Sequence, residues 1–271
     1  MENKILTVAA LQVPSLPIEK AKLDYYLAIA KSKKVSLLLL PEYVVNLFFK
    51  ELEKTPLGLV EDQGKMQKEN LLNLSKVYNI TIVSPLIWVE KKKIYKLMAV
   101  FDKGHFKAFE QRTLMPYGHW NERAFFDEGL STHATPGFIT VDGFKIAIMG
   151  GYELHFDAYW QKIRDKKTDL VLLPTVSTFE SRVRWREIAK TRAFLSNTYI
   201  LRANRIGEFE SKEGKWSFYG DSFLASPYGE IESNLGKSEE ILIAEVSKSE
   251  LAAARKSWGF GKISSNIGMI E

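Results

Sequence analysis

Short apolar runs alternate along the chain with stretches whose apolar residues recur at helical spacing. Leu23, Tyr26, Leu27 and Ala30, for example, follow the i, i+3, i+4, i+7 spacing of a helix with one apolar face. Strands that alternate with amphipathic helices indicate an α/β protein. The elements expected in the first half are strands at 5–13, 35–40 and 80–83, a helix at about 65–78, and a hairpin of 96–102 and 107–111.

The second half of the sequence repeats this order. The strand that ends at Pro41 has a counterpart ending at Pro174, and the turn at Gly104 has one at Gly229, at near-equal offsets. This favours two similar halves, although apolar strands also resemble one another by chance. The expected elements are strands at 144–149, 169–173 and 199–201, a helix face with Phe156, Tyr159, Trp160 and Ile163, and another with Trp185, Ile188, Ala189 and Arg192.

Strands that are apolar on both faces need cover on both sides. Two half-sheets, each with helices on one face, would stack their bare faces together. We therefore expect an α/β fold of the α-β-β-α sandwich type, in a single domain over residues 1–271, because no Gly-, Ser- or Pro-rich linker divides the chain. The apolar tail, about 256–271, has no clear period and is expected to pack on the domain or on a second subunit.

Composition narrows the possible chemistry. The 271 residues include no cysteine, which excludes disulfides, thiolate nucleophiles and cysteine-ligated metals. The four histidines lack the spacing of a metal site, so neither a metal nor a cofactor is expected. The net charge of +5 comes from interleaved basic and acidic residues, which is typical of a solvated surface and argues little for nucleic-acid binding. No apolar run suits a membrane span or a secretion signal, so a cytoplasmic protein is expected.

Two segments carry candidate chemistry. Glu42 directly follows a buried strand, where open α/β sheets gather their sites, and a half-buried carboxylate there suits a general base. A capping or salt-bridged glutamate is the alternative. The long connection from Leu114 to Thr140 joins the halves and is rich in aromatic residues, which is typical of a pocket lining or of a well-packed surface loop.

Eight motifs in order give the chain a family resemblance. They are Val8-Ala-Ala-Leu-Gln12, Leu40-Pro41-Glu42, Arg112-Thr-Leu-Met-Pro-Tyr-Gly118, Gly151-Tyr-Glu-Leu-His-Phe156, Asp169-Leu-Val-Leu-Leu-Pro174, Arg192-Ala193, Ala203-Asn204-Arg-Ile-Gly207 and Gly220-Asp-Ser-Phe-Leu-Ala-Ser-Pro-Tyr-Gly229. Over nearly its whole length the chain resembles the nitrilase (carbon–nitrogen hydrolase) superfamily. The resemblance implies an α-β-β-α sandwich with an internal pseudo-twofold, in agreement with the two halves.

The resemblance also implies a Glu–Lys–Cys triad, in which a thiolate attacks the substrate, a carboxylate moves protons and an ammonium stabilises the oxyanion. Glu42 lies at the glutamate position, but Gln111 lies at the lysine position and Gly151 at the cysteine position. A shift of one residue would place Arg112 at the lysine position, at the cost of the motif register. The family often has a second glutamate after the glycine of the Leu-Met-Pro-Tyr-Gly motif, where this chain has His119.

These departures predict a protein without the standard amidase or nitrilase activity. We expect a pocket bounded by Glu42, Gln111, Tyr117, His119, Gly151, Tyr152 and Thr175. It would bind a small amide or carboxylate, or serve only as a protein-interaction surface. The alternative is a carbon–nitrogen hydrolase that acts on a small amide or an N-carbamoyl compound through water activated by Glu42. Family members commonly dimerise, so a homodimer is expected.

Overall fold

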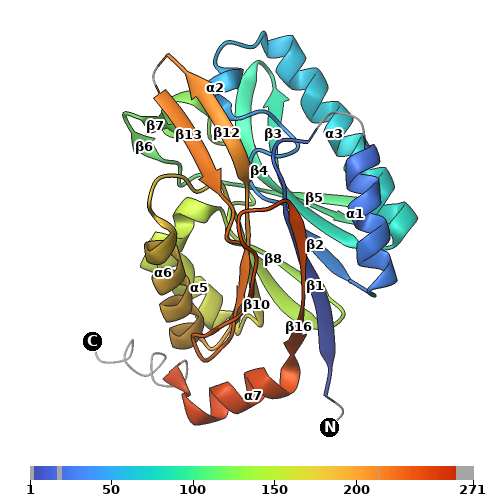
Figure 1. Ribbon diagram of the computed structural model, residues 1–271, viewed down its shortest axis with the longest axis vertical. Coiled ribbons are helices and arrows are strands. Elements are labelled where there is room, and N and C mark those ends of the chain that lie inside the picture. The colour runs from blue at the N-terminus through green and yellow to red at the C-terminus, as the bar shows by residue number, and fades with distance from the viewer. Residues whose placement is uncertain (1–2, 17–19, 213, 261–271) are drawn as a thin grey trace.

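Two six-stranded sheets pack face to face, and helices cover their outer faces (Figure 1). The computed structural model describes residues 3–16, 20–212 and 214–260. This is the α-β-β-α sandwich expected from the sequence, and the expectation is confirmed. No helix in these ranges is long and apolar enough to cross a membrane.

The first sheet combines parallel strands at its centre with antiparallel strands toward its edges. Helices α1 (Ala21–Ser32) and α3 (Leu57–Tyr78) make the crossovers between the parallel strands and cover the outer face (Figure 1). A short helix, α2 (Phe49–Leu52), precedes α3. In sheet order the strands are β16 (Glu240–Ser247), β1 (Ile5–Gln12), β2 (Leu37–Leu39), β3 (Thr81–Glu90), β4 (Lys93–Asp102) and β5 (His105–Glu110).

The second sheet has the same organisation, with parallel strands at its centre. Its outer face is covered by α5 (Asp157–Asp165) and α6 (Arg182–Ser196), and a 3₁₀ turn, η1 (Gly151–His155), precedes α5. In sheet order the strands are β8 (Gly137–Val141), β9 (Phe144–Ile148), β10 (Leu170–Thr175), β11 (Tyr199–Asn204), β14 (Phe223–Ala225) and β15 (Ile231–Asn234).

The two sheet orders correspond strand by strand. The run β1-β2-β3-β4-β5 matches β9-β10-β11-β14-β15, and β16 and β8 add the equivalent outer strand to each sheet. The internal repeat read from the sequence is therefore a repeat of structure. A hairpin of β12 (Ile206–Ser211) and β13 (Gly214–Tyr219) is inserted between β11 and β14 in the second half.

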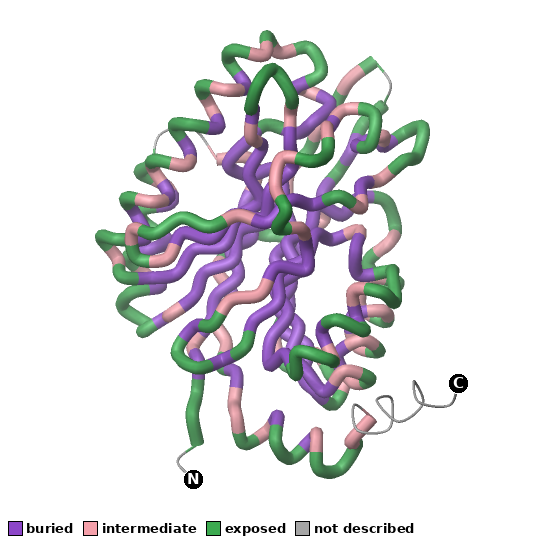
Figure 2. The backbone as a smooth tube through the Cα atoms, turned by 180° about the vertical axis from the view of Figure 1, so that it is seen from behind, coloured by how far each residue is buried: buried purple, intermediate pink, exposed green. Residues whose placement is uncertain are grey.

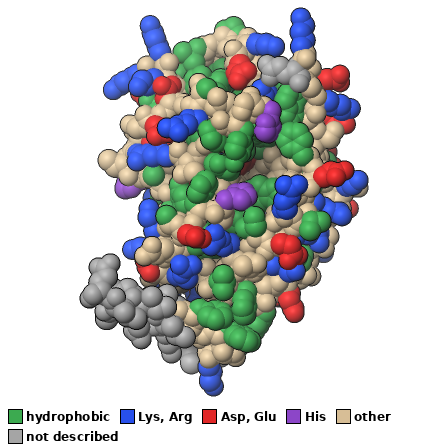
Figure 3. All heavy atoms as spheres, turned by 90° about the vertical axis from the view of Figure 1, so that its left-hand side faces the viewer, with side chains coloured by type: hydrophobic (Ala, Val, Ile, Leu, Met, Phe, Trp, Pro, Cys, Tyr) green, Lys and Arg blue, Asp and Glu red, His purple; other side chains and the backbone are tan. Residues whose placement is uncertain are grey.

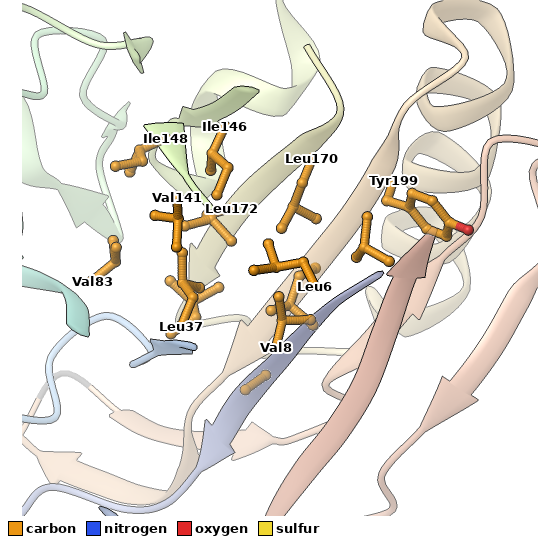
Figure 4. Close-up of a cluster of buried hydrophobic side chains, with 14 of the residues drawn as sticks. Leu6, Val8, Leu37, Val83, Val141, Ile146, Ile148, Leu170, Leu172 and Tyr199 are labelled. Atoms are coloured by element: carbon orange, nitrogen blue, oxygen red, sulfur yellow. The ribbon is translucent and has the colours of Figure 1, made fainter. Parts of the chain in front are cut away.

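The largest apolar cluster lies between the sheets. Leu6, Val8 and Leu37 of the first sheet face Ile146 and Leu172 of the second (Figure 4). Figure 2 shows the buried residues concentrated in the strands, with exposed residues on the helices and loops around them. Burial of apolar side chains on both faces of the strands explains their non-alternating sequences.

Helix α3 begins earlier than the expected residue 65. Its first two turns contain Gly58 and Gly64, which weaken the helical signal in the sequence. In the fold, Gly64 packs against β3, where a Cβ atom would lie 2.7 Å from the carbonyl oxygen of Ile87. Glycine therefore permits a close approach of helix to sheet, and this tertiary packing overrides the local propensity.

The connection between the halves and the C-terminal region complete the fold. The segment 114–140 forms β6 (Pro116–Tyr117), β7 (Trp120–Asn121) and α4 (Glu122–Phe125), and its end belongs to β8. Helix α7 (Lys248–Ser257) follows β16. Beyond it, Trp258 and Phe260 contact the ring of Phe194 on α6, at centroid distances of 5.3 and 5.2 Å. The rest of the expected tail contact, 261–271, lies outside the described residues.

Candidate active site

Glu42 lies where the carboxyl ends of β2 and β10 meet. After β2 the chain turns at Pro41, and the backbone N–H of Glu42 donates to the carbonyl of Thr175, 3.3 Å away on the other sheet. Glu42 is only 2% exposed. The symmetry of the sandwich thus brings a carboxylate from one half against the strand end of the other.

Gly151 faces this carboxylate directly. Its backbone N–H donates to Glu42 Oε1 at 3.0 Å. A Cβ atom at position 151 would lie 3.3 Å from Glu42 Oε1 and 2.9 Å from the Thr175 methyl carbon. The position assigned to the nucleophile by the resemblance therefore points at Glu42, but it carries no side chain and the Thr175 methyl packs closely against it.

Lys96 places a cation beside Glu42 that the motifs in the sequence did not identify. Its Nζ lies 2.7 Å from Glu42 Oε2 and 2.8 Å from Glu122 Oε1, and the residue is 2% exposed. The motif comparison found Gln111 at the lysine position, and the structure brings an ammonium to Glu42 from a different residue. The signal in the sequence was a lysine inside the otherwise apolar run of β4.

Lys96 and Gln111 are cross-strand neighbours. Leu97 on β4 pairs with Glu110 on β5, and the N–H of Gln111 donates to the carbonyl of Lys96 at 2.9 Å. Directly opposed residues of an antiparallel pair project from the same face. Gln111 is buried too, and its Cδ lies 2.3 Å from where a Cβ of Gly150 would be, so its amide packs on the glycine pair.

Arg112 does not take the lysine position. Its side chain is 41% exposed, and its Nη2 lies 3.3 Å from Glu110 Oε2 and donates to the carbonyl of Ser131. The one-residue shift considered from the sequence therefore has no counterpart in the fold, because adjacent residues of an extended strand project to opposite faces.

Glu122 is the second carboxylate of the cluster. It opens α4, is fully buried, and accepts a hydrogen bond of 2.5 Å from the Tyr43 hydroxyl. The family motif predicts this carboxylate at position 119, where the chain has a histidine. The glutamate comes three residues later, after the β6–β7 turn. Two carboxylates therefore surround one ammonium.

Burial and charge shift the proton affinities of this cluster. Burial raises the pKa of Glu42, and the Lys96 ammonium offsets only part of that effect. Burial disfavours the charge on Lys96, yet the carboxylates of Glu122 and Glu42 raise its pKa overall. The result is a firmly held ammonium beside a carboxyl group that binds protons more readily than an exposed glutamate, as a general acid–base group requires.

Thr175 is held in place from the far side of the site. Its Oγ1 lies 2.7 Å from Asn204 Oδ1 and accepts from Arg202 Nε at 3.1 Å. Arg202 is fully buried and also donates to Ser177 Oγ at 2.8 Å. These bonds fix the rotamer of Thr175, so its methyl group stays directed at Gly151. Sequence reasoning did not single out Arg202.

The remaining expected residues form an aromatic group at the surface. The hydroxyls of Tyr117 and Tyr152 lie 3.1 Å apart, and the rings of Tyr117 and His119 stack at 6.0 Å. His119 also contacts Phe179 at 5.6 Å. Tyr117 and His119 are exposed and Tyr152 is partly so, whereas Glu42, Gln111, Gly151 and Thr175 are buried, so the seven residues fall into an inner polar cluster and an outer aromatic group.

A surface hollow of about 390 Å³ adjoins the aromatic group and is lined by His119, Phe179 and residues 214–216 of β13. Figure 3 views the side on which Figure 1 places β6, β7 and β13, and histidines lie there among hydrophobic side chains. Within the described part of the chain, no three His, Asp or Glu side chains gather as ligands for a metal ion.

Comparison with known proteins identifies the family of this chain. The carbon–nitrogen hydrolase family model matches residues 7–256. The chain belongs to the carbon–nitrogen hydrolase family. The chain is 23% identical over 243 residues to 2-oxoglutaramate amidase of Bacillus subtilis (strain 168), and the match covers 89% of each chain. It is also 23% identical over 279 residues to N-carbamoylputrescine amidase of Solanum lycopersicum, covering 95% of this chain and 91% of the relative.

Solved structures show the same fold. A carbon–nitrogen hydrolase from Helicobacter pylori G27 superposes with a TM-score of 0.83 at 18% identity, covering 95% of this chain and 94% of that one. Nit3 of Saccharomyces cerevisiae, a nitrilase superfamily member, gives a TM-score of 0.76 at 19% identity and 94% coverage of both chains. The chain therefore has the nitrilase-type sandwich fold. Its sequence has no cysteine.

Proposed function

We propose that this carbon–nitrogen hydrolase family member binds a small amide without hydrolysing it through a covalent intermediate. The observation that carries the proposal is Gly151. Its Cα faces Glu42, as a nucleophile would have to, yet position 151 offers no side chain and the chain contains no cysteine to replace it. Without a thiolate no thioester forms, so the remaining groups offer hydrogen bonding, charge and proton transfer but no covalent step.

The space in front of Gly151 is partly filled. The Thr175 methyl carbon lies 2.9 Å from where a Cβ would be, closer than two carbon atoms normally approach. Thr175 is held by Asn204 and Arg202, so this contact belongs to the fold. The site is thus shaped for glycine, which favours a ligand-binding role over a hydrolase awaiting a nucleophile.

The charges of the inner cluster favour a neutral ligand. Glu42 and Glu122 face a single ammonium, so a further carboxylate would meet repulsion, whereas a carboxamide or ureido group brings N–H donors and a carbonyl acceptor. Two buried acceptors, Glu122 Oε2 in the charged cluster and Gln111 Oε1 beside Gly150, have no hydrogen-bond partner in the structure. Unpaired buried acceptors are costly, and the N–H groups of an amide would satisfy them.

A paired assay tests the proposal. The purified protein is incubated with a panel of small amides, N-carbamoyl amino acids and nitriles, and both turnover and calorimetric binding are measured. We expect binding of at least one amide, weakened by Glu42→Gln, and no turnover. Turnover that Glu42→Ala abolishes would overturn the proposal, and absence of any binding would favour a protein-interaction surface instead.

Direct hydrolysis by water is the second candidate, and Lys96 is the observation that favours it. A carboxyl group of raised pKa beside an ammonium retains general acid–base chemistry and charge stabilisation. Loss of the covalent step costs roughly 10² or more in rate, because each catalytic group typically contributes that much. Slow turnover of an N-carbamoyl compound, lost in both Glu42→Gln and Lys96→Met, would identify this activity.

We also propose a homodimer. The apolar contacts of Trp258 and Phe260 with Phe194 lie on the outside of α6, and Trp258 remains 48% exposed. Half-covered aromatic side chains at the surface are suited to packing against a second subunit. Light scattering at micromolar concentration should give twice the mass of 31.0 kDa, and a monomeric mass would contradict the proposal.

A further inference from the structure

The ammonium of the site comes from β4, whereas the lysine position implied by the motif is residue 111, directly after β5. Lys96 and residue 111 are opposed across the β4–β5 pair and project from the same face. Their Cβ atoms are therefore about 5 Å apart. A lysine side chain spans such a distance easily, so an ammonium from either strand can reach the carboxylate of Glu42.

We propose that Lys96 performs the role of the triad lysine in this protein, having replaced residue 111 across the strand pair. Its Nζ bonds Glu42 Oε2 at 2.7 Å, while Gly151 N bonds Glu42 Oε1 at 3.0 Å, so one carboxylate joins the ammonium to the nucleophile position. Lys96 is then the cation that faces a ligand's carbonyl oxygen. The inference rests on the proposed function in one respect, namely that position 151 faces the bound group.

The surroundings of Lys96 argue for this role. Its Nζ bonds two carboxylates and lies 4.9 Å from the centroid of the Tyr43 ring, so the ammonium is held at a fixed place beside Glu42. Arg112, two residues after β5, is 41% exposed and bonds Glu110 and the carbonyl of Ser131. Gln111, at the lysine position implied by the motif, has a neutral amide that packs on Gly150.

The lack of native cysteine gives a direct test. Gly151→Cys introduces the only thiol in the chain, and Thr175→Ser removes the methyl group that would contact its Cβ while keeping the Oγ1 bonds to Asn204 and Arg202. In this double variant the rate of alkylation by iodoacetamide, followed from pH 5 to pH 10, reports the thiol pKa. The assay needs no substrate. All variants keep the Glu42 carboxylate, so differences between their rates do not come from the loss of that group.

Three further variants in this background locate the cation. Lys96→Gln should raise the thiol pKa by about one unit or more and so slow alkylation by about tenfold or more at any pH below both thiol pKa values. The exchange Lys96→Gln with Gln111→Lys should restore the rate to within about threefold, which corresponds to half a pKa unit. Lys93→Gln, an exposed lysine on the same strand, is the matched control and should change nothing.

The result that overturns the inference is a folded Lys96→Gln variant with an unchanged rate, or an exchange variant that reacts no faster than Lys96→Gln. If the cysteine background does not fold, thermal unfolding in the wild-type background decides. The exchange variant should then unfold near the wild-type temperature and Lys96→Gln well below it, and equal losses would refute the inference. Turnover by the native protein would overturn the proposed function alone, without affecting these comparisons.

Discussion

Replacing Lys96 by methionine tests the electrostatics of the inner cluster. The substitution keeps a side chain of similar length but removes the charge that lies 2.7 and 2.8 Å from two buried carboxylates. Breaking a buried ion pair by removing one partner costs about 3–5 kcal/mol. Protonation limits the cost, since neutralising one carboxyl of ordinary pKa at pH 8 takes about 5 kcal/mol, and at pH 5 only about 1 kcal/mol.

The pH dependence has a definite sign. Burial raises the pKa of Glu42 and Lys96 opposes that effect, so without the ammonium the Glu42 pKa in the folded variant lies further above its value in the unfolded chain. Such a group contributes stability that is fully present below the unfolded pKa and is lost as the pH rises through the folded pKa. The loss of stability in Lys96→Met should therefore grow from about 1 kcal/mol at pH 5 to about 3–5 kcal/mol at pH 8.

Urea unfolding followed by tryptophan fluorescence at both pH values measures this difference. A loss of about 4 kcal/mol corresponds to about 7 °C in Tm for a chain of this size. Lys93→Met, which removes an exposed charge from the same strand, should change stability by less than about 0.5 kcal/mol. A loss in Lys96→Met that is equal at pH 5 and pH 8 would refute the assignment of Lys96 to a buried carboxylate pair.

Five further substitutions probe the surroundings of the site and the packing of α3. Glu153 lies on η1, is fully buried and accepts a hydrogen bond from the N–H of Gly150 at 2.8 Å, and burial raises its pKa to about 7. The wild type should therefore lose about 2–3 kcal/mol of stability between pH 5 and pH 8 as this carboxyl ionises, whereas Glu153→Gln should not, as urea unfolding at both pH values would show. Gly151→Ala should lose about 1–3 kcal/mol through contact with the Thr175 methyl, and Thr175→Ser should recover most of it in calorimetric melts. Gly64→Ala should destabilise by a similar amount against the Ile87 carbonyl, whereas Gly58→Ala, with open space around it, should stabilise by up to about 1 kcal/mol.

Much of the fold was predictable because apolar periodicity reflects burial directly. The central strands β1, β2, β9 and β10 are apolar on both faces, and the residues spaced as one helical face in α1 are those buried in the structure. The start of α3 was not predictable, because Gly58 and Gly64 weaken its local signal and the helix depends on contact with β3. Element bounds that depend on such contacts lie beyond a local reading of the chain.

The site was predictable only as far as its residues lie in motifs. Glu42 and Gly151 sit at motif positions, and the structure brings them together. Lys96 and Glu122 reach the same cluster from outside those positions, one through strand pairing and the other through the β6–β7 turn. Strand pairing is a property of the folded chain, so a motif comparison reports the loss of a lysine from position 111 without showing whether its charge is lost.

The two departures from the triad therefore have different consequences. An ammonium acts through the position of its charge, and a long side chain can deliver that charge from a neighbouring strand. A nucleophile must stand at one backbone position, and Gly151 supplies none. The remaining cluster is costly as mere structure, because replacing a buried ion pair by apolar residues of similar volume is often stabilising by 1–4 kcal/mol. A buried cluster of Glu42, Lys96 and Glu122 without a nucleophile therefore supports the proposal of a bound polar ligand.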